Sequence, residues 1–190
     1  MVVSAERISK VLDYQDRSTC VLFGDGAGAM VLEAEEGGAD IPACLHSTID
    51  EKEVLYCPLY DEKNPLDGGT AGATATGVKM NGREVYKFAV NALAHSVEEV
   101  LQKANLSKED IAWFVPHQAN ERIVKSAAQK LDVPMEKMAM TIEEYGNTSS
   151  ASIPLTLAKL DREGLLHPGD KLVLTGFGAG LTYGAVVITW

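Results

Sequence analysis

The sequence is poor in cysteine, and the few cysteines it has are badly placed for the usual cysteine chemistries. Cys20, Cys44 and Cys57 stand far apart in 190 residues and form no Cys-x-x-Cys pair, so neither a disulfide framework nor a zinc site is expected. None of them begins a predicted helix, where the helix dipole would activate a thiol. Cys20 lies in a strand-like run, and we expect it to be a buried, inert thiol.

Long apolar runs and net positive charge are missing as well. No apolar stretch approaches the roughly 20 residues that span a bilayer, and the start Met-Val-Val-Ser-Ala-Glu does not read as a signal peptide. We therefore expect a cytoplasmic protein without a membrane partner. Seventeen basic residues against 27 acidic ones give a net charge of −10. This balance argues against a general nucleic-acid surface but allows one local basic patch for an acidic partner.

The order of apolar patterns predicts an α/β protein. At 190 residues, with 46% hydrophobic residues, the chain is long enough for one domain, or one and a half, with a real core. Strands are expected over residues 1–6, 20–23, 30–33, 41–49, 111–115, 171–175 and 185–188, and helices over residues 83–105, 119–131 and from Ser149 or Ser150 to 163. A long loop is expected over 61–77, and the last helix should be central and buried. Such alternation is typical of a sheet with helices on its faces.

Two polar residues follow apolar or glycine-rich segments in positions suited to chemistry. His117 comes directly after an expected buried strand, and ligand sites gather at such strand ends. Asn147 stands in a Gly-Asn-Thr turn before the last helix. Two neutral hydrogen-bond donors from loops suit the stabilisation of a negative charge on a carbonyl oxygen. Taken singly, each has a plainer explanation: His117 as a helix-entry residue, Asn147 as ordinary turn chemistry, and the glycines near residue 178 as a tight turn.

Four motifs together carry a specific resemblance. They are Phe-Gly-Asp-Gly-Ala-Gly-Ala at residues 23–29, Val-Pro-His-Gln-Ala-Asn at 115–120, Gly-Asn-Thr-Ser at 146–149, and Gly-Phe-Gly-Ala-Gly-Leu-Thr at 176–182. In this order they resemble the thiolase-fold condensing enzymes, and within them the β-ketoacyl-acyl-carrier-protein synthase III family. The resemblance covers only the C-terminal part of that family. It implies a thiolase-like half, with a mixed five-stranded sheet and helices on both faces, plus terminal strands of the preceding half. Residues 1–37 would be the remnant of the N-terminal half and residues 38–190 the C-terminal domain.

The resemblance also implies an activity. Members of the family are dimeric acyltransferases that start fatty acid synthesis by a decarboxylative Claisen condensation of acyl-CoA, here acetyl-CoA, with malonyl-acyl-carrier protein. They use a Cys-His-Asn triad and need no cofactor or metal. His117 and Asn147 would be its second and third members, with His117 neutral and donating from Nε2–H. The backbone amide of Ala179 would complete an oxyanion hole.

The same resemblance assigns further residues. It implies that Asn120, Gly82 and Phe177 line the substrate site, and that Arg122, Lys87 and Lys125 dock the acidic carrier protein. The plainer alternative for these three cations is a solvated helix face.

The family's nucleophilic cysteine has no match in this chain. Its motif lies in the N-terminal half, before the segment that this chain resembles, and Cys20, Cys44 and Cys57 do not fit it. We therefore expect this chain alone to form no acyl-enzyme. The alternatives are a non-catalytic module that binds carrier protein or a partner subunit, and half of a related condensing enzyme of polyketide or hydroxymethylglutaryl-CoA type.

Overall fold

A four-stranded mixed sheet forms the centre of the molecule. The computed structural model describes residues 1–33, 36, 40–57 and 77–190, so the expected loop at 61–77 lies, except for Gly77, outside the described residues. The strands follow the order β3 (Ala43–Ser47), β8 (Thr182–Thr189), β7 (Lys171–Gly178) and β6 (Trp113–Pro116). Only β6 and β7 are parallel, and the other two pairs are antiparallel. The expected α/β class with a mixed sheet is confirmed.

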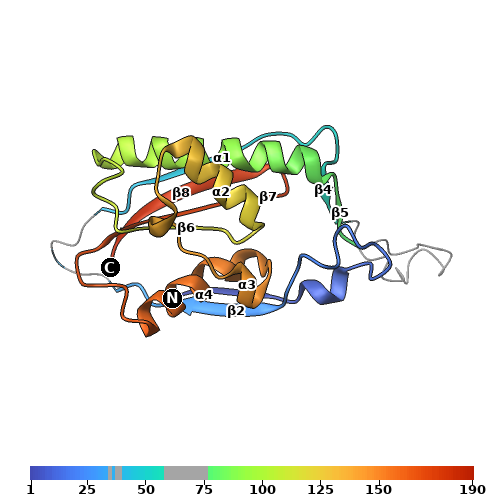
Figure 1. Ribbon diagram of the computed structural model, residues 1–190, viewed down its shortest axis with the longest axis horizontal. Helices are drawn as coiled ribbons and strands as arrows, with labels where there is room; N and C mark the ends of the chain where they lie inside the picture. The colour runs from blue at the N-terminus through green and yellow to red at the C-terminus, as the bar shows by residue number, and fades with distance from the viewer. Residues whose placement is uncertain (34–35, 37–39, 58–76) are drawn as a thin grey trace.

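Helices cover both faces of this sheet, as expected (Figure 1). The long helix α1 (Gly82–Ala104) and α2 (Glu121–Leu131) pack on one face, where Phe114, Val173 and Val187 enter a common core. Helix α4 (Ser152–Arg162) packs on the other face against Val115, Leu172 and Leu174. Neighbouring strand residues thus feed opposite cores, because side chains alternate across a sheet. In the described residues, no helix has the length and apolar character needed to cross a membrane.

The predicted five-stranded sheet is wrong by one strand among the described residues. Next to β6 the chain makes a single parallel bridge between Phe114 and Met138, and the Ala139 N–H donates to the Phe114 carbonyl at 2.9 Å. Beyond that point the side chain of Gln118 replaces the backbone ladder. Its Nε2 donates to the carbonyl of Ala139 at 3.1 Å, and its Oε1 accepts from the Thr141 N–H at 2.9 Å. A buried side-chain amide therefore occupies the place of a fifth strand.

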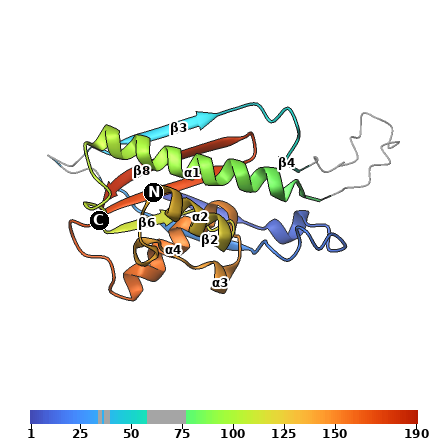
Figure 2. The same ribbon diagram turned by 45° about the horizontal axis from the view of Figure 1, so that its top comes forward.

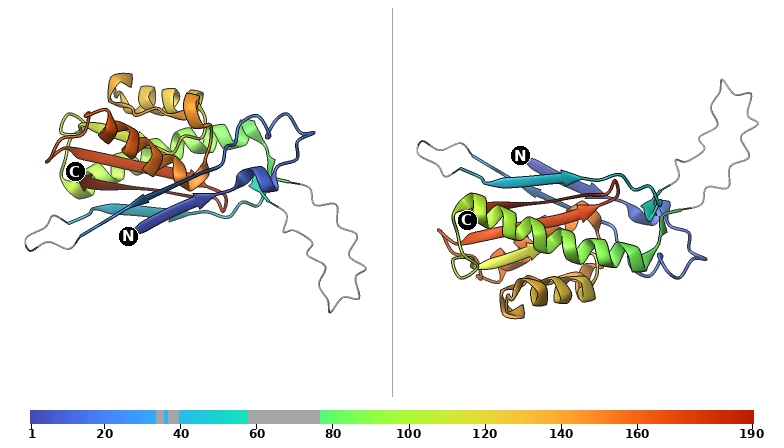
Figure 3. Two further views of the ribbon diagram at one scale, coloured as in Figure 1. Left: turned by 90° about the horizontal axis from the view of Figure 1, so that it is seen from below. Right: turned by 90° about the horizontal axis from the view of Figure 1, so that it is seen from above.

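A second, two-stranded sheet lies apart from the first. Strand β1 (Val2–Glu6) pairs antiparallel with β2 (Gly26–Met30), and Figure 3 shows the two running side by side. Helix α4 lies between this pair and the four-stranded sheet (Figure 1), which agrees with the expected central position of that helix. The division of the chain at residue 37 stays a prediction.

The strands predicted at 20–23 and 30–33, with a glycine turn between them, are wrong. Residues 17–22 form turns, Cys20 is half-buried, and the strand runs through the glycine-rich segment itself. The physical reason is close packing on α4: a Cβ added at Gly28 would lie 2.8 Å from Cβ of Pro154. Only a strand of small residues can approach the helix so closely.

The remaining elements are short. The rest are η1 (Ile8–Val11), β4 (Leu55–Tyr56), β5 (Lys79–Met80), η2 (Met135–Lys137), α3 (Ile142–Tyr145) and η3 (Ser149–Ala151). The helix predicted over 83–105 is confirmed as α1, which Asn81 caps at its start and left-handed Asn105 ends. Neither Ser149 nor Ser150 caps α4, because both lie in η3 and Ser149 has φ +52°.

Candidate functional site

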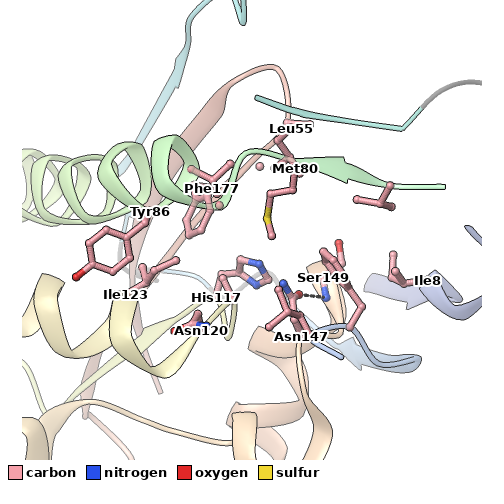
Figure 4. Close-up of a pocket in the computed structure, with 18 of the residues that line it drawn as sticks. Ile8, Leu55, Met80, Tyr86, His117, Asn120, Ile123, Asn147, Ser149 and Phe177 are labelled. Carbon is pink, nitrogen blue, oxygen red and sulfur yellow. Dashed lines mark hydrogen bonds between the residues drawn. The ribbon is translucent and has the colours of Figure 1, made fainter. Parts of the chain in front are cut away.

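A cavity of about 740 Å³ opens where the ends of several elements meet (Figure 4). Its wall includes the carboxyl ends of β6 and β7, the first turns of α1 and α2, the turn before η3, and the β4–β5 pair. The sequence-predicted residues that line it are His117, Asn147, Ala179, Asn120, Gly82, Phe177 and Arg122. The structure therefore brings together seven of the nine residues singled out in the sequence.

His117 is held at the carboxyl end of β6. Its N–H donates to the Thr175 carbonyl on the neighbouring strand β7 at 2.7 Å. The ring of Phe177 stands at 65° to the imidazole with centroids 5.5 Å apart, and Figure 4 shows both rings at the cavity. Burial lowers the pKa of His117 to about 4, because the charged form loses its hydration. The imidazole is therefore neutral at pH 7.

A hydroxyl from α4 orients this imidazole. Ser152 Oγ lies 2.7 Å from Nδ1 of His117 and also accepts the Gln118 N–H at 3.2 Å. While it accepts from Gln118, the hydroxyl can donate its own hydrogen to Nδ1. Donation from Ser152 to Nδ1 corresponds to the tautomer with hydrogen on Nε2, which is the donor expected from the sequence. The sequence offered no signal for Ser152, which lies 35 residues away from His117.

Asn147 is fixed by its backbone and by its side-chain oxygen. Its N–H donates to the Leu22 carbonyl and its own carbonyl accepts from the Gly24 N–H, both at 2.9 Å. Asn147 Oδ1 accepts the Ser149 N–H at 2.9 Å (Figure 4). Because the oxygen is engaged, the Nδ2 amide group is the part of the side chain left to act as a donor.

The first glycine-rich motif, residues 23–29, packs against the turn that carries Asn147. A Cβ added at Gly24 would lie 2.3 Å from the Tyr145 carbonyl oxygen, so the two segments dock backbone to backbone. Gly146 has φ +66° and ψ −160°, a conformation that is essentially restricted to glycine. The motifs at 23–29 and 146–149, far apart in sequence, thus form one structural unit that presents Asn147.

The other predicted substrate-site residues are placed around the same cavity. Asn120 is the N-cap of α2, where its Oδ1 accepts the Arg122 N–H at 2.9 Å. Gly82 is the first residue of α1. The Ala179 carbonyl accepts from Thr182 Oγ1 at 3.2 Å. In the described part of the chain the Ala179 N–H has no hydrogen-bond partner, so this amide is available to a ligand oxygen.

The three predicted docking cations differ in their surroundings. Lys87 Nζ pairs with Glu84 at 3.0 Å and Lys125 Nζ with Glu121 at 2.5 Å, and neither lysine lines the cavity. Arg122 does line it, and among the described residues its guanidinium forms no ion pair. Sequence reasoning missed Arg83, a second arginine in the cavity wall. Its position next to Gly82 in the sequence was the available signal.

The apolar wall was also missed. Leu55 and Met80 pair across β4 and β5 on the side of the cavity above the imidazole in Figure 4, and Val85 and Ile123 line the same cavity. These residues come from four different elements, so no local pattern could connect them. Cys57, an exposed thiol, lines the cavity as well.

Comparisons with known proteins point to one family. The family model described as 3-oxoacyl-[acyl-carrier-protein] synthase III C terminal matches residues 101–190, and the model described as 3-oxoacyl-[acyl-carrier-protein] synthase III matches residues 1–49. The whole chain is 46% identical to the beta-ketoacyl-[acyl-carrier-protein] synthase III of Clostridium acetobutylicum, of which it spans 58%.

Solved structures give the same result. The 3-oxoacyl-(acyl carrier protein) synthase III of Pseudomonas aeruginosa is similar over 99% of this chain and 56% of its own, with a TM-score of 0.87 at 40% identity. The priming beta-ketosynthase of a polyketide biosynthetic pathway is similar over 99% of this chain and 56% of its own, with a TM-score of 0.80 at 32% identity. The chain thus spans somewhat more than half the length of the relatives it matches.

Proposed function

This chain belongs to the 3-oxoacyl-acyl-carrier-protein synthase III family, and on that premise we propose that it supplies the residues that promote decarboxylation in the family's condensation reaction. The observation that carries the proposal is the convergence of His117 and Asn147 on one cavity, each with its other polar atom already engaged. Nε2–H of His117 and Nδ2–H of Asn147 are then two neutral donors for the thioester oxygen of a malonyl group.

The proposed step breaks the bond between the malonyl carboxylate and C2. Carbon dioxide leaves, and the bonding electron pair passes to the enolate, whose charge rests on the thioester oxygen between the two donors. The enolate carbon then attacks an acyl thioester, and the thiolate of the acylated cysteine departs. Each donor aimed at the developing charge contributes about 3 kcal/mol, or a factor of about 10²–10³ in rate.

The neutrality of His117 suits this role. A pKa of about 4 leaves the imidazole uncharged at pH 7, so it stabilises the enolate by hydrogen bonding without transferring a full proton to it. Protonation of the enolate carbon would end the reaction before condensation. Burial of the ring beside Phe177 and the apolar wall therefore supports a role for His117 in hydrogen bonding to the enolate rather than in proton transfer.

We propose that the nucleophilic cysteine is not one of the three in this chain. Cys44 is 3% exposed, its thiol donates to the Ser96 carbonyl at 3.3 Å, and burial raises its pKa. Cys20 lies among turns and Cys57 in a short exposed segment, and neither begins a helix. The family relatives are longer than the matched segment, and the nucleophile is assigned to that additional length.

Arg122 is proposed to receive the acidic carrier protein, and Arg83 joins it at the same cavity. Two arginines on a chain with net charge −10 would give the docking its direction. Lys87 and Lys125 remain proposals with weaker support, because each already has a carboxylate partner. By family membership we also propose acetyl-CoA as the acyl donor, the start of fatty acid synthesis as the pathway step, a homodimeric cytoplasmic enzyme, and no further cofactor.

Complementation tests the proposal. This chain is mixed with the N-terminal portion of the Clostridium acetobutylicum relative that precedes the match, and condensation of acetyl-CoA with malonyl-acyl-carrier protein is measured. Activity should require both polypeptides and should fall by about 10²–10³ with His117→Ala or Asn147→Ala. His167→Ala and Asn91→Ala, at exposed positions outside the cavity wall, should leave it unchanged. Carrier-protein binding without turnover in any mixture would support the non-catalytic module instead.

A further inference from the structure

A second group of reactive side chains lies outside the cavity, between β3 and α1. Cys44 and His46 are two residues apart on β3 and therefore face the same side, toward α1. His95 and Glu99 are four residues apart on α1 and share a face of that helix. Figure 2 shows β3 running beside α1 at the edge of the sheet. Nothing in the proposed condensation uses these four side chains.

Their ligand atoms are close to one another. Cys44 Sγ, one ring nitrogen of His46 and a carboxylate oxygen of Glu99 all lie within 4.8 Å of each other. Glu99 Oε2 is 2.5 Å from Nε2 of His46 and 3.7 Å from Nε2 of His95. The imidazole rings of His46 and His95 have centroids 5.6 Å apart.

Neighbouring groups hold these ligands in place. Lys103 Nζ takes the other oxygen of Glu99, Oε1, at 2.9 Å, so Oε2 is left facing the two imidazoles. Tyr183 stacks on His46 with centroids 4.9 Å apart and an interplanar angle of 22°. Such outer partners orient metal ligands and increase metal affinity. The two histidines are partly open to solvent, with 33% and 58% of their side chains exposed, so an ion has a path of entry.

We propose that Cys44, His46 and Glu99, joined by the exposed His95 after a rotation of its side chain, form a binding site for a zinc-like divalent cation that ties the edge strand β3 to α1. Zinc binds thiolate, imidazole and carboxylate ligands and prefers four of them in a tetrahedral arrangement. Calcium and magnesium prefer shells of oxygen ligands and do not fit this donor set. Cysteine spacing along the chain gives no signal for this site, because its ligands come from a strand and a helix that are far apart in the sequence.

Binding requires small, defined changes. His46 binds the cation through Nε2 as the tautomer with its hydrogen on Nδ1, and the cation takes the place of the hydrogen between His46 and Glu99, which opens that contact from 2.5 Å to the roughly 3 Å edge of a tetrahedral shell. The Cys44 thiol loses its hydrogen bond to the Ser96 carbonyl together with its proton. One proton, from the Cys44 thiol, is released to solvent for each ion bound, which favours binding as pH rises.

Cobalt(II) titration of the untagged, chelator-treated chain tests the site. We expect one bound ion per chain, with visible d–d bands of a tetrahedral complex and a near-ultraviolet band from the Cys44 thiolate. His46→Ala and Glu99→Gln should each weaken binding by at least about 100-fold, more than the loss of an outer partner does. Cys44→Ser should remove the thiolate band.

Matched controls separate the site from adventitious surface binding. His167 Nδ1 lies 3.5 Å from a carboxylate oxygen of Asp170 on an exposed turn. This histidine–carboxylate pair is not part of the proposed site, so His167→Ala should leave cobalt affinity unchanged. His95→Ala, at the most exposed ligand, guards against unfolding and should still lower affinity. Equal affinity in the His46→Ala and unmodified chains, or a cobalt spectrum of octahedral type without a thiolate band, would overturn the proposal. Calorimetric titration with zinc should give the same order of variants.

Discussion

Ser152 Oγ lies 2.7 Å from Nδ1 of His117 and connects the central helix α4 to the cavity. The same oxygen accepts the N–H of Gln118, so one hydroxyl sets both the imidazole and the backbone that follows it. The arrangement makes Ser152 a positioning residue for His117, because it does not itself line the cavity.

Ser152→Ala should remove the preference of His117 for the tautomer with hydrogen on Nε2. We expect nitrogen-15 NMR of labelled histidine to show hydrogen on Nε2 in the unmodified chain and a mixture of tautomers in the variant. Condensation in the complemented enzyme should fall about 10-fold, because one hydrogen bond of about 1–1.5 kcal/mol is lost. Ser150→Ala, whose hydroxyl bonds to Glu6 instead, is the matched control. An unchanged His117 spectrum in Ser152→Ala would contradict this role.

Acid should destabilise the fold through His117. Its folded pKa of about 4 lies below the unfolded value of about 6.5, so the unfolded chain binds a proton more readily. The stabilisation is fully present above pH 6.5 and is lost as pH falls toward 4, by about 3 kcal/mol at most. Urea unfolding at pH 7 and pH 4.5 measures it. His117→Gln should lose less stability over this interval, and equal losses in both proteins would show that other groups dominate.

Gln118 should be costly to replace because it substitutes for a strand. Its side chain is fully buried and bonds to Pro116, Ala139 and Thr141. Gln118→Met, similar in shape, leaves those groups unpaired and should lower the free energy of unfolding by about 3 kcal/mol or more. Asn91→Ala on the surface of α1 is the control. Chemical denaturation is the measurement, and a loss below about 1 kcal/mol would mean that water replaces the amide.

The chain alone should form no acyl-enzyme. Mass spectrometry after incubation with acetyl-CoA should find no stoichiometric adduct, because Cys44 is buried and neither Cys20 nor Cys57 begins a helix. An acetyl group on Cys57, the thiol that lines the cavity, would contradict the assignment of the nucleophile to a longer family member. Iodoacetamide labelling gives a second readout, and Cys57 should react first because it is the exposed thiol.

Charge reversal of Arg122 should weaken the carrier protein's docking. Arg122→Glu is expected to reduce binding of acyl-carrier protein about 10-fold or more at low salt, with a smaller effect at high salt. Arg162→Glu, on an exposed end of α4 across the sheet, should change binding little. Surface plasmon resonance at two ionic strengths checks both variants. Equal responses would place the docking surface elsewhere.

How far the sequence could predict the structure depends on the range of the interactions. The helices α1 and α2 were predictable within two residues because apolar spacing and the asparagines at positions 81, 105 and 120 act locally. The position of β2 was not predictable, because its glycines and alanines suggest a turn in the sequence. Only their close packing against α4 explains why they form a strand.

The sequence by itself determined which groups are the candidates for the chemistry. The motifs singled out His117 and Asn147, the resemblance they carry added Arg122, and the structure gathers all three at one cavity. Only the tertiary structure decided what holds and surrounds them: Ser152 behind the imidazole, Gln118 in place of a strand, and Arg83 in the cavity wall. It also placed Cys44 and His46 against His95 and Glu99. The contacts of Ser152, Gln118 and His46 join residues 35, 23 and 53 positions apart, and no pattern along the chain records a distance that is set by the packing of strands against helices.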